Sequence, residues 1–269
     1  MVQRLIEQDT EPDPDGPGRR ITNGTAADRQ ISVSDPDMRH GRKSRSQTIK
    51  GYKRHIAVDL DIPGLICATK ATAANVPDKD AVGPLVDWIE QGGTIAEAHV
   101  DRAYVEAPEL VERQKDGLRL VTKPHPVGNH TGHFSKTAFR FNFSKRKVTC
   151  PAGESVRIRY GKTVAFPAER CDDCVLREQC TACQKGRGRT LHIHPREPFQ
   201  AKLRREVQTR EGREERRERV VVEHGLARVG HIQGTKAKFK GEDKNDFDLQ
   251  RQAVINNCYL LNRQWQDAA

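Results

Sequence analysis

The sequence contains little of what builds a large apolar core. Aromatic residues make up 5% of the 269 residues, methionine and tryptophan occur twice each, and the mean hydropathy is −0.79. No apolar run approaches the roughly 20 residues that a membrane-spanning helix needs, and no signal-peptide-like stretch opens the chain. These absences predict a soluble, cytoplasmic protein, long enough for one core domain with an appended module.

Acidic residues are outnumbered, and the basic surplus is clustered. The formal net charge is +10, and the stretch "RHGRKSRSQTIKGYKR" (39–54) holds seven Lys or Arg residues and no acid. A polyanion such as nucleic acid is the natural partner of such a chain. On charge alone, a solvated surface explains any single basic run equally well.

Cysteines are too few and too uneven for a disulfide scaffold of this length. Five of the seven lie between residues 150 and 183, and "CDDCVLREQCTAC" contains two C-x2-C pairs. Two such pairs are typical of zinc sites, because each turn presents two sulfur atoms to one ion. The alternatives are a reduced, metal-free cluster, or a site in which His192 or His194 is a ligand.

The first two thirds of the chain predict an α/β pattern. After a linker-like segment (1–47), residues 52–60 and 64–72 predict a hairpin around the turn "DIPG". A helix over 78–92 with Asp78 as N-cap, a strand over 94–101, a helix over 107–117 and a strand over 118–124 follow. Residues 48–125 are therefore expected to form the first part of a sheet domain.

The remaining third predicts short β-strands and then helices. Residues 126–197 form a Cys-rich β insertion, expected to have little apolar core of its own, and residues 198–269 form a helical part interrupted at Gly212 and Gly225. The last helix carries an apolar stripe and can be capped by Asn245. The stripe consists of Phe247, Val254, Cys258, Leu261 and Trp265. The residues assigned to the core are Cys67, Trp88, Cys258 and Trp265.

One acid lies where chemistry is expected on an α/β sheet. Asp101, in "EAHVDRAYVE", ends a predicted strand, and ligands bind such sheets beyond the carboxyl ends of strands. An Asp at a strand end is more often a turn residue. The position alone therefore leaves both interpretations open.

Several phrases in order resemble the bacterial insertion-sequence transposases with a DDE catalytic domain. They are "SVSDPDMR", "GYKRHIAVDLD", "TAANVPD", "VDRAY", "CPAG" with "CDDCVLREQCT", and "RERVVVEHGLARV" followed by "FKGEDKNDFDLQRQAVINN". The resemblance implies an RNase H-like mixed sheet with flanking helices, interrupted by the Cys-rich insertion. It also implies Mg²⁺-dependent (or Mn²⁺-dependent) cleavage and transfer of DNA strands at element ends, in which carboxylates hold two metal ions.

The resemblance assigns roles to three residues. Asp101, followed by Tyr104, matches the family's second Asp. Glu223 matches the Glu of a signature that runs Tyr, two residues, Arg, three residues, Glu, six residues, Lys, and Arg219 falls on the Arg position. Without the resemblance, Arg219 and Glu223 would be an ordinary i, i+4 helix pair. The signature departs at Arg216 and Gly230, where Tyr and Lys are expected, and Ala103 replaces a Gly.

The family's first Asp has no match. No strand ending in a "DGT"-like phrase precedes "GYKRHIAV", and none of Asp35, Asp37 and Asp59 is a good replacement. We therefore interpret the sequence as an amino-terminally truncated copy of such a transposase, and we expect weak metal binding and poor or absent catalysis.

The resemblance also implies ligands and partners. Cys150, Cys171, Cys174 and Cys180 would bind a structural Zn²⁺, leaving Cys183 spare. The partner would be double-stranded DNA, both at the element ends and at the target site. The protein would be associated with the nucleoid, and a homodimer on DNA is the assembly considered. The residues predicted to contact DNA phosphates are Arg42, Lys43, Arg45, Lys50, Lys53, Arg54, Arg216, Lys236, Lys238 and Lys240. The rival functions are a non-catalytic DNA-binding remnant and a zinc-dependent nucleic-acid-binding module.

Overall fold

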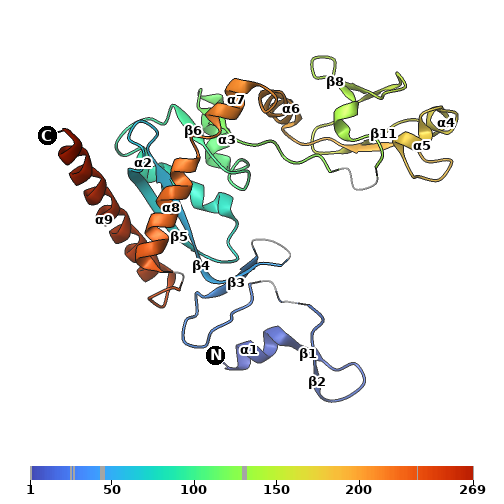
Figure 1. The fold of residues 1–269 in the computed structure, drawn as a ribbon. Coiled ribbons are helices and arrows are strands. Elements are labelled where there is room, and N and C mark those ends of the chain that lie inside the picture. Colours follow the sequence, from blue (N-terminus) through green and yellow to red (C-terminus); the bar gives the residue numbers. More distant parts are fainter. Residues whose placement is uncertain are drawn as a thin grey trace. The chain divides into compact units, whose positions relative to one another are not determined.

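The chain divides into two compact units. A computed structural model describes residues 2–24, 26, 28–42, 46–128, 132–234 and 236–268. The first unit comprises residues 1–121 and 215–269, and the second comprises residues 122–214 (Figure 1). Helices and strands are mixed in both, which confirms the α/β class. Residues 1–47, which were predicted to be linker-like, contain regular elements. These are helix α1 (Val2–Asp9), the hairpin of β1 (Thr10–Pro12) and β2 (Arg19–Ile21), and strand β3 (Arg39–Arg42).

A long hairpin forms the centre of the first unit. Strand β4 (Thr48–Val58) pairs antiparallel with β5 (Ile66–Ala73), and its first residues pair with β3 on the other edge. The carboxylate of Asp59 accepts the Ile62 amide proton at 2.7 Å and closes the turn. The predicted hairpin is confirmed. Strands β6 (Glu97–His99) and β7 (Arg119–Val121) form a separate parallel pair, so the described strands lie in several small sheets.

The predicted helix over residues 78–92 is divided in two. A 3-10 turn (η1, Asp78–Ala81) precedes α2 (Val82–Ile89), because Pro84 is tolerated only in the first turn of a helix. Asp78 is not an N-cap: its carboxylate pairs with Lys53 at 2.7 Å. Trp88, predicted as core, is 61% exposed. Helix α3 (Pro108–Lys115) follows as predicted, with proline at its start.

Helix α8 (Val220–Gln233) lies close against β4. Gly225 is inside this helix and does not interrupt it. A Cβ atom at Gly225 would be 3.1 Å from the Ile56 side chain, so the small residue allows this close approach. Val229, one turn further along the same face, is completely buried. This packing sets the position of the first turn of α8 relative to the hairpin.

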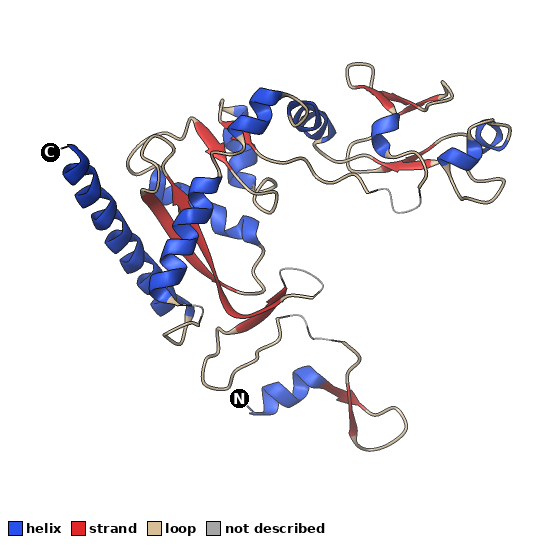
Figure 2. Cartoon of the chain, in the orientation of Figure 1, coloured by secondary structure: helices blue, strands red, loops and turns tan. Residues whose placement is uncertain are grey.

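Helix α9 (Glu242–Ala268) covers the free edge of β5 (Figure 2). Its polar side chains bind the strand's backbone: Asp246 accepts the Ala71 amide proton at 2.6 Å, and Asn257 bonds both the amide and the carbonyl of Ile66 at 2.9 Å. An uncovered strand edge would leave these groups without partners inside the protein. The helix therefore turns a mainly polar face inward, with Leu249 and Ala253 as its buried apolar residues.

The apolar stripe of α9 consequently faces outward. Phe247, Val254, Leu261 and Trp265 are 52–83% exposed and Cys258 is exposed, so the assignment of Cys258 and Trp265 to the core is wrong. Cys67, also assigned to the core, is half-buried. Asn245 is not a cap but lies inside the helix, where its amide donates to the Gly241 and Phe239 carbonyls. The periodicity located a helix face correctly but could not show what lay opposite it.

The second unit has its own apolar core, contrary to the expectation. Strands β8 (Arg140–Asn142), β9 (Lys147–Thr149) and β10 (Ser155–Arg157) form an antiparallel sheet, and β11 (Thr163–Ala165) pairs with β12 (Thr190–His192). The short helices are η2 (Lys136–Ala138), α4 (Ala168–Asp172), α5 (Arg177–Cys180), α6 (Glu197–Glu206) and α7 (Arg210–Glu215). The buried cluster is Phe139, Val148, Ile158, Val164, Phe166, Leu191 and Ile193. Apolar residues spread over many short strands meet only when the strands pair.

Candidate active site and metal centre

Asp101 lies in a tight turn directly after β6. Its side chain accepts the Arg102 amide proton at 3.0 Å, and its backbone carbonyl accepts the Tyr104 amide proton at 3.0 Å. The carboxylate is 57% exposed. The turn therefore holds Asp101 in a defined orientation while leaving it open to a ligand.

Tyr104 attaches this turn to the hairpin. Its hydroxyl lies 2.7 Å from Nδ1 of His55, and Nε2 of His55 lies 2.9 Å from the Thr72 hydroxyl. His55 is 2% exposed, and burial lowers its pKa from 6.5 to about 4. Burial raises the pKa of Tyr104, with a further contribution from Asp78 and Asp101. The hydrogen-bonded side chains of Thr72, His55 and Tyr104 are thus uncharged near pH 7, and they position the turn that carries Asp101.

The first turn of α8 completes the site. Arg219 precedes this helix and Glu223 lies in its first turn. The Arg219 guanidinium contacts Asp101 through Nη1 at 2.7 Å and Glu223 through Nη2 at 3.3 Å. Two acids that are distant in the sequence therefore meet at one cation. Burial would raise the pKa of Asp101, but the Arg102 amide and the Arg219 guanidinium outweigh it and hold that pKa below its ordinary value.

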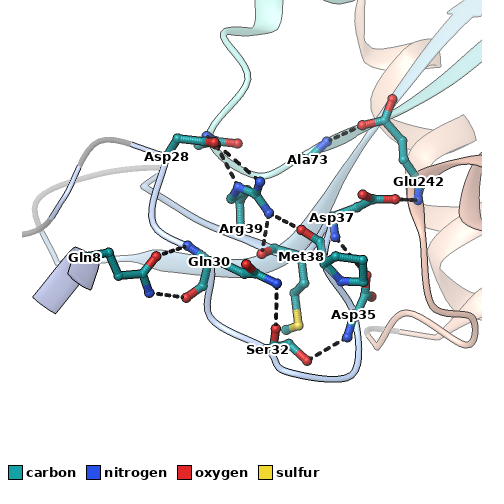
Figure 3. A network of polar contacts seen from close by, with 12 residues as sticks. Gln8, Asp28, Gln30, Ser32, Asp35, Asp37, Met38, Arg39, Ala73 and Glu242 are labelled. Carbon is teal, nitrogen blue, oxygen red and sulfur yellow. Dashed lines mark hydrogen bonds and ion pairs between the residues drawn. The ribbon is translucent and has the colours of Figure 1, made fainter. Parts of the chain in front are cut away.

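Asp35 and Asp37, two of the acids considered for the missing first position, have other partners (Figure 3). Asp35 accepts the Tyr52 hydroxyl proton at 2.8 Å and the Gly241 amide proton at 3.2 Å. Asp37 accepts the Glu242 amide proton at 3.1 Å, at the start of α9. Both acids thus fasten the segment that carries them to α9 and β4. Because Asp59 closes the hairpin turn, all three have structural contacts.

Sequence reasoning missed an acid–imidazole cluster beside Asp101. Nε2 of His99 lies 2.6 Å from Glu97 and 3.8 Å from Glu218, and the three ligand atoms lie within 4.8 Å of one another. Glu97 also pairs with Arg119. The only signal in the sequence was alternation, since Glu97, His99 and Asp101 are spaced by two along one strand. Glu218, adjacent to Arg219, was not detectable without the fold.

The ten residues predicted to bind DNA differ in accessibility. Lys43 and Arg45 lie outside the described residues. Lys53 donates to Asp78 and to the Val76 carbonyl, and Arg54 donates to the Gly234 carbonyl. Arg216 is half-buried. The exposed residues are Arg42, Lys50, Lys236, Lys238 and Lys240.

Four cysteines line one cavity in the second unit. They are Cys150, Cys171, Cys174 and Cys180. The Cys150 turn is closed by the Gly153 amide, which donates to the Cys150 carbonyl at 2.9 Å, and the Cys174 amide donates to the Cys171 carbonyl at 3.4 Å. Burial raises the pKa of Cys180, with the other three thiols contributing in the same direction. Cys183 is exposed and is not among the lining residues.

The sulfur atoms are not yet at bonding geometry for a single ion. Among the described residues, no group of three ligand atoms within 4.8 Å includes a cysteine. Zinc at about 2.3 Å from each sulfur would draw these side chains closer together. His192 and His194 are not among the residues that line the cavity.

The family assignment rests on the later part of the chain. The sequence model of the family described as "Transposase DDE domain" matches residues 149–261, less than half of the chain. Residues 149–261 are similar to the transposase DDE domain family. No curated protein and no solved structure matches the chain. None of the helices in the described ranges is long and apolar enough to cross a membrane.

The DDE match bears directly on the site. It contains Arg219, Glu223 and the four cysteines of the cavity, whereas Asp101 precedes it. Transposases act on DNA, so this similarity is what points to DNA as the substrate class. The structure adds the contact through which a residue before the matched segment, Asp101, joins two residues within it.

The buried His55 makes stability depend on pH. Because its pKa is about 4 in the folded protein and about 6.5 in the unfolded chain, the unfolded state takes up the proton first as the pH falls. The stabilisation is complete above pH 6.5 and is lost toward pH 4, a change of about 3 kcal/mol. Urea unfolding followed by circular dichroism should show a smaller decline for His55→Gln over this interval. Equal declines in both proteins would contradict the assignment.

Proposed function

We propose that the chain cleaves and transfers DNA strands at insertion-sequence ends with Mg²⁺, using Asp101 and Glu223. The observation that carries the proposal is the convergence of both carboxylates on the Arg219 guanidinium. Positions so far apart in the sequence have no local reason to meet. Both carboxylates are more than half exposed, as a site for a large polyanionic substrate requires.

The donor set fits a divalent cation that is also held by the substrate. Mg²⁺ is commonly bound through one or two carboxylates, with substrate phosphates and water as the other ligands. Asp101 and Glu223 would supply the two carboxylates, and the lowered pKa of Asp101 keeps it ionised at neutral pH. When bound, such ions activate the attacking oxygen and stabilise the leaving oxygen of a phosphoryl transfer. Arg219 would orient the acids and contact a DNA phosphate through its planar guanidinium.

A cleavage and strand-transfer assay in Mg²⁺ tests this function. Asp101→Asn and Glu223→Gln should each reduce the rate at least ~100-fold, because each removes a charged ligand without changing side-chain size. Asp61→Asn and Glu211→Gln, at exposed acids, are the matched controls and should retain the rate. An active wild-type protein that is indifferent to both site substitutions would refute the assignment.

A non-catalytic DNA-binding remnant is the second candidate, and one observation favours it. Asp35, Asp37 and Asp59, the acids considered for the first position, are held by structural partners and do not join Asp101 and Glu223. In that case the chain would occupy element ends without cutting them. Salt-sensitive binding to duplex DNA, with no cleavage in Mg²⁺ or Mn²⁺, is the result that distinguishes the remnant.

Zinc binding by Cys150, Cys171, Cys174 and Cys180 belongs to the same proposal. Its support is that the four thiols line one cavity while Cys183 does not. A zinc-dependent nucleic-acid-binding module would need the same site, so zinc alone does not separate it from the enzyme. The exposed residues Arg42, Lys50, Lys236, Lys238 and Lys240 are proposed to contact DNA phosphates. A homodimer on DNA, at the nucleoid, is the proposed assembly.

A further inference from the structure

The β-meander of the second unit carries a strong and unbalanced positive charge. Residues 139–162 contain seven Lys or Arg residues and one acid, Glu154. Glu154 faces Arg170 at 3.8 Å. None of these basic residues was among those predicted to bind DNA. The β-meander is therefore a second basic surface, separate from the residues predicted to bind DNA.

Strand pairing gathers this charge on one face of the sheet. Val148 is buried, whereas its neighbour Lys147 is exposed and lies directly opposite Arg157 of β10. Like charges at directly opposed positions destabilise a sheet. Arg140 of β8 is exposed on the same sheet. A face built this way is costly unless a polyanion rests on it.

A hollow lies at the end of this face. It has a volume of about 420 Å³ and is lined by Arg146, Arg157, Ile158, Arg159 and Tyr160. The three arginines are exposed, and none of them takes part in an ion pair within the described part of the chain. The hollow thus presents three guanidinium groups and one phenol, with no carboxylate in its lining.

The backbone of Arg146 is held in an uncommon conformation. Its φ is +49°, in the left-handed region that residues with a side chain seldom adopt. Its carbonyl accepts the Ile158 amide proton at 2.9 Å, which joins the two sides of the hollow. Such conformations persist where the surrounding structure enforces them, and they are frequent at ligand-binding positions.

We propose that this hollow binds the phosphates of DNA, and that Arg146, Arg157 and Arg159 are its ligands. Planar guanidinium groups match phosphate oxygens in pairs, which favours arginine over lysine at such a site. The partner rests on the proposed function, whereas the site is a surface of the second unit distinct from Asp101 and Glu223. It would anchor DNA through the backbone and without reading bases.

The test uses the full chain and duplex DNA, with binding measured over a range of salt concentrations. The variant is Arg146→Gln, Arg157→Gln and Arg159→Gln combined. The matched control is Lys185→Gln, Arg187→Gln and Lys202→Gln, which removes the same charge from exposed positions of the same unit. The site variant should bind about 10- to 100-fold more weakly, and the slope of log K against log salt should be shallower by ~2–3, because about three phosphate contacts are lost.

Two further arms separate a phosphate site from a general charge effect and from a folding defect. The triple Arg→Lys variant should recover most of the salt slope, since it keeps the charge. Hydrogen exchange should show the β-meander intact in the glutamine variant, because replacing Arg157 relieves its repulsion with Lys147. A titration with inorganic phosphate alone distinguishes a site for free anions.

Several results would show that the hollow does not bind DNA phosphates. Equal weakening by the site and control variants would overturn the proposal, as would unchanged binding by the site variant. Loss that is matched by a collapsed meander, or saturation by inorganic phosphate with no change in DNA binding, would also overturn it. If wild-type protein binds no DNA at all, the proposed function itself fails. If wild-type protein binds DNA and the site variant binds it equally well, the hollow is not a DNA site, but the proposed function still stands.

Discussion

Removing the proposed zinc ion is expected to unfold the loop that carries Cys171, Cys174 and Cys180 while the apolar core of the second unit persists. Cys171 and Cys180 lie in short helices, since α4 has five residues and α5 has four, and Cys174 lies between the two. Helices of this length are not stable alone. Structural zinc supplies ~10–16 kcal/mol of apparent binding free energy in small modules, which far exceeds what such helices provide.

The measurement combines metal analysis with hydrogen exchange. The purified chain should contain one zinc ion, and a chelator should remove it and abolish protection over residues 168–183. Residues 139–149 should stay protected, because Phe139 and Val148 belong to the buried cluster. The Cys150→Ser and Cys174→Ser variants should behave like the chelated protein.

Cys183→Ser is the matched control for the zinc site. It lies in the same loop, is exposed and is not a lining residue of the cavity, so it should retain both metal and protection. Zinc loss in Cys183→Ser as large as in Cys174→Ser would show that the ligand set is wrong. Full protection in a metal-free protein would show that the cysteines need no metal.

Replacing Glu197 with alanine is expected to destabilise the second unit by about 3 kcal/mol. Glu197 is fully buried at the start of α6 and pairs with both Lys136 and Arg204. It also accepts the His194 amide proton at 2.9 Å. Burial opposes its ionisation, but these partners outweigh it and lower its pKa. Removing one member of a buried ion cluster leaves the other charges uncompensated, which typically costs ~3–5 kcal/mol.

The same helix provides the control. Glu206 is 43% exposed and lies 3.6 Å from Lys202, so Glu206→Ala should change stability by at most ~0.5 kcal/mol. Both tryptophans lie in the first unit, so tryptophan fluorescence does not report on the second. Hydrogen exchange of peptides from residues 122–214 measures the stability of the second unit separately. Since the pKa of Glu197 is lowered, the difference between wild type and Glu197→Ala should shrink as the pH falls below about 4.3. A difference independent of pH would mean that lost packing, and not the charge, is responsible.

Local patterns were enough for some of the elements and for part of the site. The alternation of residues 52–60 and 64–72 around "DIPG" predicted the hairpin, because strand periodicity and turn residues act over a few positions. The resemblance selected Asp101, Arg219 and Glu223, and the structure brings these three into contact. Their catalytic role remains a prediction. The Glu97, His99 and Glu218 cluster escaped notice because Glu218 is distant from the other two in sequence.

The sequence by itself determined the hairpin of β4 and β5, helix α3, the basic charge and the residues able to do chemistry, because turn residues, local periodicity and side-chain chemistry are local properties. Only the tertiary structure decided which face of α9 is buried. The free edge of β5 needed hydrogen-bond partners, so polar residues such as Asp246 and Asn257 turned inward and Trp265 turned outward. It likewise decided that Asp35 and Asp37 bind the amides of Gly241 and Glu242, since these partners lie some two hundred residues further along the chain.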